Sequence, residues 1–196
     1  VRHCERERFR VSDDRLPIKI FAEQGVLVEN DFDVLSNVLE NTMGIAGFSI
    51  PAEHDPEDAS IILVVGSVPY LTSKVIDAGD PYGVEFFERT ARLERENSTS
   101  SHLEGRETET CYVSTIDREP HQRVSIYLQG DELESCLPRS LMVVLGLNET
   151  NTGLPTVTDR TGGHTTLTFA DQLFLKMLYF ENFPVNSGVE PIRDFW

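Results

Sequence analysis

The sequence predicts an α+β domain in which a mixed β-sheet carries helices packed mainly on one face. Strand-like and helix-like segments alternate through the first half of the chain, and residues 60–66 are apolar on both faces, which is typical of a central strand. A length of 196 residues with 39% hydrophobic content allows one sizeable core. We expect a single domain over residues 16–183, a charged N-terminal arm at 1–15 and a C-terminal tail at 184–196.

The first half of the chain predicts three strands and one helix. Residues 17–22 alternate between apolar and polar side chains, as a strand does, and residues 48–50 and 60–66 predict the next two strands. Between the first and second of these strands, residues 31–43 carry apolar side chains at spacings of three and four. This spacing predicts an amphipathic helix with one buried stripe, which Gly44 is expected to end.

The middle of the chain predicts an irregular segment, a helix and a hairpin. Residues 67–83 contain two prolines and two glycines and predict irregular structure. Residues 85–96 have a helical pattern of apolar and oppositely charged side chains. Residues 111–116 and 124–128 predict two strands of a hairpin joined by a loop over 117–123.

The last third of the chain predicts two helices. The first spans residues 137–145, with Pro138 in its first turn, where a missing N–H costs little, and Gly146 at its end. The second spans residues 169–179 and begins at a Thr-x-x-Asp sequence, residues 168–171, that resembles a capping box. Its broad apolar stripe predicts a heavily buried helix.

The charge and the cysteines limit the compartment and the partners. An excess of 33 acidic over 17 basic residues gives a net charge of -16, which repels phosphate backbones and argues against nucleic-acid binding. No apolar run is long enough to span a bilayer. Cys111 and Cys136 begin a predicted strand and a predicted helix; they form either a disulfide, which implies an oxidising compartment, or two buried free thiols. Cys4 in the arm is then left over for an intermolecular bond or a lipid.

The sequence lacks the common motifs of catalysis. It contains no nucleophile elbow, no phosphate-binding glycine loop and no HExxH zinc motif, and its five histidines fall in expected loops or in the arm without metal-ligand spacing. We therefore expect no cofactor, no metal and no catalytic residue. The alternative is a hydrolase with an unorthodox site in the 148–166 loop, built from Glu149, Asp159 and His164.

The helix expected at 137–145 follows the last strand and closes with Leu-Gly-Leu around Gly146. This order of elements resembles the metzincins, zinc peptidases whose corresponding helix carries HExxHxxGxxH. With Gly146 placed on the glycine of that motif, the three ligand positions fall on Arg139, Val143 and Glu149, and the general base falls on Ser140. Arginine stays protonated and valine has no lone pair, so the resemblance implies a metallopeptidase-like scaffold with a degenerate zinc motif.

A second resemblance depends on three short motifs in a fixed order: Pro17–Ile20, Cys136 followed by Leu145–Asn148, and Leu167–Asp171 followed by Leu178 and Tyr179. In this order they resemble a proteobacterial family of secreted proteins and lipoproteins, catalogued as a domain of unknown function (2927). The similarity extends from about Pro17 to Val189. It implies a periplasmic or extracellular bacterial protein, membrane-associated in some cases, and it brings no established activity.

Together these observations predict a non-catalytic extracytoplasmic binding or accessory subunit. The expected partner is another protein or an envelope complex, with peripheral or lipid-anchored attachment to the membrane as a further expectation. Phe9 in the arm and Phe195 and Trp196 in the tail are candidate partner-binding residues, because aromatic side chains in segments without a core pattern often become ordered against another surface. Packing of the arm and tail on their own domain is the alternative.

Overall fold

A computed structural model of the chain describes residues 18–27, 29–47, 61–99, 111–118, 121–145, 147, 153, 155–159 and 163–179. The described strands form one four-stranded sheet in the order β1-β2-β4-β3. Its strands are β1 (Ile18–Ala22), β2 (Ile61–Gly66), β3 (Cys111–Arg118) and β4 (His121–Gln129). The protein is thus an α+β domain with a mixed sheet, as the sequence predicts.

The sheet is parallel over three strands and antiparallel at one edge. β1 pairs with β2 in parallel, with Ile20 opposite Leu63, and β2 pairs with β4 in parallel, with Leu63 opposite Ile126. β3 and β4 form an antiparallel hairpin in which Cys111 lies opposite Leu128. β2 lies between two strands, which explains why it is apolar on both faces.

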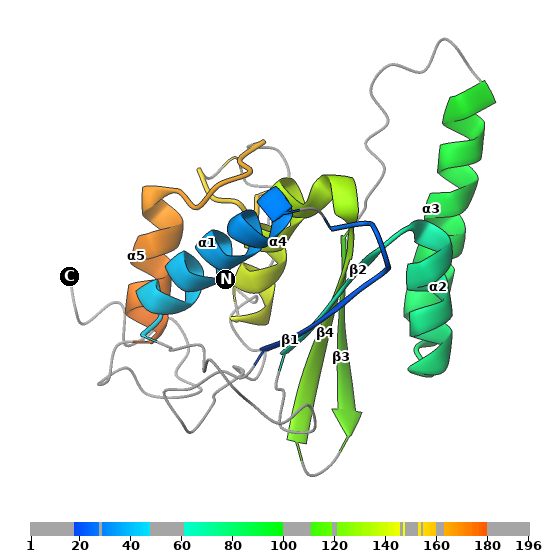
Figure 1. Cartoon of the computed structure of the whole chain (residues 1–196). Coiled ribbons are helices and arrows are strands. Elements are labelled where there is room, and N and C mark those ends of the chain that lie inside the picture. The colour runs from blue at the N-terminus through cyan, green and yellow to red at the C-terminus, as the bar shows by residue number, and fades with distance from the viewer. Residues whose placement is uncertain are drawn as a thin grey trace.

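Helices cover both faces of this sheet (Figure 1). On one face lie α1 (Glu29–Ile45), α4 (Leu133–Val144) and α5 (Phe169–Leu178). On the other lie α2 (Val68–Asp77) and α3 (Pro81–Thr99). A single 3₁₀ turn, Gly130–Glu132, joins β4 to α4. The expectation that helices pack mainly on one face is therefore wrong for α2 and α3.

Alternation along the central strands separates two hydrophobic cores. Leu63 on β2 and Ile126 on β4 belong to an aliphatic core beneath α1, α4 and α5. Val64 and Tyr127, one residue along each strand, belong to a second core with Phe87 of α3. Successive side chains of a strand point to opposite faces, so the two-residue period accounts for both cores.

The segment predicted to be irregular, residues 67–83, contains α2 and the start of α3. Its prolines begin helices rather than interrupt them: Pro69 lies in the first turn of α2 and Pro81 is the first residue of α3. A proline is tolerated there because the first N–H groups of a helix have no intrahelical acceptor. Gly79, with φ of 70°, makes the turn between the two helices.

Four smaller expectations also differ from the structure. α1 continues through Gly44 to Ile45. Pro138 lies inside α4, which begins at Leu133, rather than in its first turn. His121 begins β4 and is not in a loop. α5 is less buried than its stripe predicts, since Phe169 is 81% exposed and Leu173 is also exposed.

Other predictions are confirmed. Cys111 and Cys136 form a disulfide with a Cα–Cα distance of 5.7 Å, which ties the start of β3 to α4. Thr168 and Asp171 form the capping box at the start of α5. Among the described helices, none has both the length and the apolar character needed to cross a membrane.

Candidate functional site

Three of the four positions that the metzincin resemblance aligns with the zinc motif lie on α4, the helix that follows the central strand β4. Arg139 and Val143 are four residues apart and half-buried, so they share one face of the helix one turn apart. Ser140, in the general-base position, is buried. Glu149, the third-ligand position, lies outside the described residues. The structure therefore brings two of the three ligand positions onto one helix face.

The chemistry of this face does not favour a metal. The Nε atom of Arg139 is buried and has no hydrogen-bond partner within the described structure. A guanidinium group is a hydrogen-bond donor only and offers no lone pair to a cation. Across the described ranges, no group of three or more His, Cys, Asp or Glu side chains is arranged to hold a metal ion.

The residues of the alternative hydrolase site have different environments. His164 is exposed, whereas Asp159 is buried, and its N–H donates to the Thr156 carbonyl at 3.2 Å within a turn. Glu149 falls outside the described residues, and so do Phe9, Phe195 and Trp196. The structure thus places only two of the three hydrolase candidates, one buried and one exposed.

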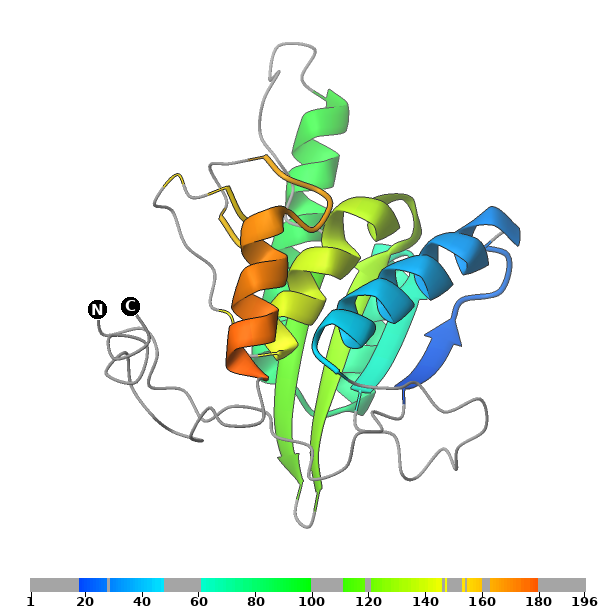
Figure 2. The ribbon, with the colours of Figure 1, turned by 90° about the vertical axis from the view of Figure 1, so that its left-hand side faces the viewer.

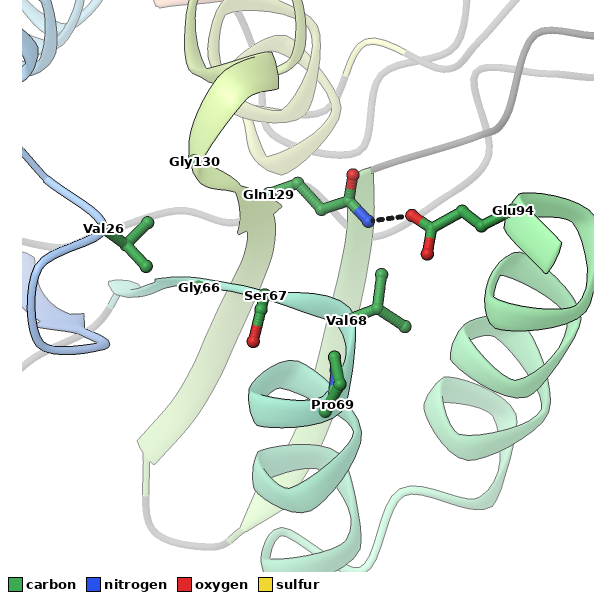
Figure 3. A pocket seen from close by; sticks show the side chains of 8 residues that line it. All are labelled: Val26, Gly66, Ser67, Val68, Pro69, Glu94, Gln129 and Gly130. Atoms are coloured by element: carbon green, nitrogen blue, oxygen red, sulfur yellow. Dashed lines mark hydrogen bonds between the residues drawn. The ribbon is translucent and has the colours of Figure 1, made fainter. Parts of the chain in front are cut away.

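A crevice opens at the carboxyl ends of the parallel strands (Figure 3). The chain leaves β1 towards α1 on one face and leaves β2 towards α2 on the other, which is the arrangement that opens a crevice between neighbouring parallel strands. Its volume is about 460 Å³. It is lined by Val26, Gly66, Ser67, Val68, Pro69, Glu94, Gln129 and Gly130.

Two glycines in this crevice allow close packing. A Cβ on Gly66 would clash with the ring of Tyr70, and one on Gly130 would clash with the side chain of Val26. Gln129 is 8% exposed, and its Nε2 donates to Glu94 Oε1 at 2.9 Å, which connects the end of β4 to α3. The crevice walls are thus fixed by contacts between elements distant in sequence.

The charge of the crevice does not suit an anion. The Ser67 N–H donates to Glu23 Oε2 at 2.7 Å, so a carboxylate already occupies the electropositive N-terminus of α2. No lysine or arginine is among the described residues that line it. The hydrogen bond from the Ser67 backbone, followed by one from its side chain, lowers the pKa of Glu23. A carboxylate with a lowered pKa is a weaker general base than an ordinary glutamate.

A well-paired polar cluster surrounds Asp80, between α2 and α3. Its carboxylate accepts hydrogen bonds from the N–H groups of Tyr82 and Gly83, both at 3.1 Å, from Tyr112 Oη at 2.9 Å and from Ser114 Oγ. Burial acts to raise the pKa of Asp80, but the hydrogen bonds from Ser114, Gly83, Tyr112 and Tyr82 hold it below its ordinary value. Burial, and then the hydrogen bond to Asp80, raise the pKa of Tyr112 above its ordinary value.

We interpret the Asp80 cluster as structural rather than catalytic. Its donors are consumed by one carboxylate that begins α3 and joins it to β3, and rings from Phe86, Phe87 and Tyr127 pack around Tyr112. The lowered carboxyl pKa of Asp80 and the raised phenol pKa of Tyr112 both move away from neutral pH, where a general acid or base would titrate.

A second, larger pocket lies on the opposite face, between α1, α4 and the segment that leads into α5. Its volume is about 650 Å³, and its lining is rich in amide and hydroxyl side chains. The sequence does not predict this pocket, because the asparagines of α1 are typical of the polar face of an amphipathic helix. Pro138, which lines it, is the one local signal of an interrupted helix in this region.

Comparison with known proteins adds no relative: the sequence matches no family model and no curated protein. The metzincin-like order of elements and the resemblance to the secreted bacterial family therefore enter only as parts of a proposal.

Proposed function

We propose that this protein is a non-catalytic extracytoplasmic binding or accessory domain built on an inactive metallopeptidase-like scaffold. The observation that carries the proposal is the pair Arg139 and Val143 on one half-buried face of the helix that follows β4. In a zinc peptidase of metzincin type these two places would hold histidines four residues apart. A fixed cation and an aliphatic side chain leave such a scaffold without its metal.

The arrangement around α4 supports this proposal. α4 directly follows a strand of the parallel part of the sheet, and the antiparallel strand β3 forms the edge beside it. The disulfide between Cys111 and Cys136 supports an extracytoplasmic location, because such bonds persist in oxidising compartments. The proposed partner is another protein or an envelope complex, and the aromatic residues of the arm and tail are its proposed contacts.

Metal analysis tests the inactive scaffold. The full chain, incubated with zinc and then desalted, is expected to retain no stoichiometric zinc. The double variant Arg139→His/Val143→His is expected to bind zinc more tightly than Glu88→His/Arg92→His, a control with the same spacing on exposed positions of α3, because Glu149 is proposed to supply a third ligand. One tightly held zinc per wild-type chain would refute the proposal, and equal zinc binding by the two variants would remove its metallopeptidase-like part.

Deletion of the terminal segments tests the proposed partner contacts. Chains lacking residues 1–15 or 184–196 are expected to lose co-purification with a partner from the native envelope fraction while the domain keeps its melting temperature. Unchanged assembly of both deletion variants by light scattering and pull-down would show that Phe9, Phe195 and Trp196 do not bind the partner.

A further inference from the structure

The pocket between α1 and α4 includes one buried hydroxyl that has no hydrogen-bond partner in the described structure. Figure 2 shows α1, α4 and α5 on the face turned to the viewer, and the pocket is lined by α1, α4, residues 165–167 and Gln172 of α5. Thr42, which lines it from α1, is 0% exposed, and its Oγ1 has no hydrogen-bond partner. A helical threonine normally bonds the carbonyl of the preceding turn, so an unsatisfied hydroxyl is costly.

The remaining lining selects the chemistry of a ligand. Asn37, Asn41 and Gln172 each offer both a donor and an acceptor, as hydroxyl groups do. Glu134 is the one charged side chain among the described lining residues, and it is exposed, so the pocket neither attracts an anion nor encloses a cation. Apolar side chains such as Val38 and Ile45 supply a surface for the C–H faces of a ligand. A volume of about 650 Å³ lies within the usual range for small-molecule sites.

We infer that this pocket binds a small, neutral, polyhydroxylated molecule of the size of a mono- or disaccharide. Its hydroxyl groups exchange hydrogen bonds with the amides of Asn37, Asn41 and Gln172, which fix its orientation. The inference deepens the proposed binding function and depends on it. In a hydrolase, the molecule in this pocket would be a substrate rather than a ligand that is only bound.

Calorimetric titration of the full, disulfide-bonded chain tests the ligand class. The probes are glucose, galactose, mannose, N-acetylglucosamine, maltose and cellobiose, with glucosamine and glucuronate as cationic and anionic analogues of one ring. At least one neutral saccharide is expected to bind saturably, and to bind at least about tenfold more tightly than its charged analogue. Saturable binding of none of the six neutral probes, or tighter binding of glucuronate, would overturn the inference.

Two variants locate the site on the neutral saccharide that binds. Gln172→Leu removes an amide from the pocket and is expected to weaken binding about tenfold, whereas Gln24→Leu, a matched change at an exposed turn, leaves it unchanged. Equal affinity of the two variants would place the ligand elsewhere.

These results are separable from those that test the proposed function. If the protein retains zinc but binds a neutral saccharide, the inactive-scaffold proposal is wrong and the pocket inference holds. If the protein retains no zinc and binds none of the six saccharides, the scaffold proposal holds and the pocket inference is wrong. Hydrolysis of a bound saccharide would keep the ligand class and replace the binding role by catalysis.

Discussion

The two faces of the sheet differ in how completely their buried polar groups are paired. On the α2–α3 face, the 8% exposed carboxylate of Asp80 receives four hydrogen bonds and lies beside a packed cluster of aromatic rings. On the face of α1, α4 and α5, the buried carboxylate of Asp171 is also paired, but the hydroxyl of Thr42 and the Nε of Arg139 are buried without partners in the described structure. That face also holds the larger of the two pockets considered above.

The difference separates a structural role from a binding role. A buried polar group with a full set of partners rigidifies the fold, and its loss is costly. A buried polar group without partners lowers stability and calls for an explanation such as a bound water or ion. We therefore assign a structural role to the Asp80 cluster and place the ligand on the opposite face.

The largest expected effect concerns the disulfide, which lies within the core of the pocket-bearing face. Cys111 and Cys136 are separated by 25 residues, and closing a loop of that length is expected to contribute about 3.5 kcal/mol. Urea denaturation of Cys111→Ser/Cys136→Ser should show this loss in the free energy of unfolding. Cys4→Ser is the matched control and should leave stability unchanged. A double variant as stable as the wild type would show that the disulfide does not stabilise this face.

The next effect concerns the satisfied cluster of the α2–α3 face. Asp80→Ala leaves two hydroxyl and two backbone donors without their acceptor, and we expect a loss of about 3 kcal/mol in the free energy of unfolding. Asp77→Ala, on an exposed position of α2, is the control and should change stability by less than about 0.5 kcal/mol. Equal effects of the two variants would contradict the structural role of Asp80.

The capping box of α5 should have a smaller effect. The Thr168 hydroxyl accepts from the Asp171 N–H at 3.2 Å and contacts the Pro155 carbonyl at 2.6 Å, so Thr168→Ala is expected to cost about 1 kcal/mol. Thr168→Ser keeps the hydroxyl and should restore most of that loss in thermal unfolding. Failure of serine to restore stability would assign the effect to the lost methyl group rather than to the cap.

The smallest effect is a dependence on acid. Because hydrogen bonds hold the pKa of Asp80 below its ordinary value of 3.8, the ionised carboxylate stabilises the folded state above that pH. The contribution is lost as the pH falls through the lower, folded-state pKa. Urea denaturation at several pH values below about 4 should therefore show a steeper loss of stability in the wild type than in Asp80→Asn. Parallel curves would show that the charge of Asp80 is not what its partners stabilise.

Local signals predicted the elements that local chemistry controls. The Thr-x-x-Asp sequence at 168–171 identified the start of α5, and the uniformly apolar run of β2 identified a central strand. Predictions from local signals were wrong where the same residue type can either interrupt a helix or lie at its start or inside it. Pro69 and Pro81 suggested irregular structure but begin helices, and Gly44 suggested a helix end, whereas the left-handed φ of 84° lies at Gly47.

The sites depended on tertiary arrangement that the sequence does not display. Arg139 and Val143 were identifiable because their spacing is local to one helix. The pocket between α1 and α4 was not, since Asn37, Asn41 and Gln172 come together only when helices distant in sequence pack on one sheet face. The exposure of Phe169 likewise follows from how α5 docks and not from its stripe of apolar residues.

The most direct test of the contrast between the two faces is chemical-shift mapping of the full chain with whichever neutral saccharide binds. We expect saturable chemical-shift changes for Asn37, Asn41 and Gln172 and none for Tyr112 or Ser114 around Asp80. Shifts confined to the Asp80 cluster, or to the crevice beside Gln129, would contradict the assignment of binding to the face of α1, α4 and α5.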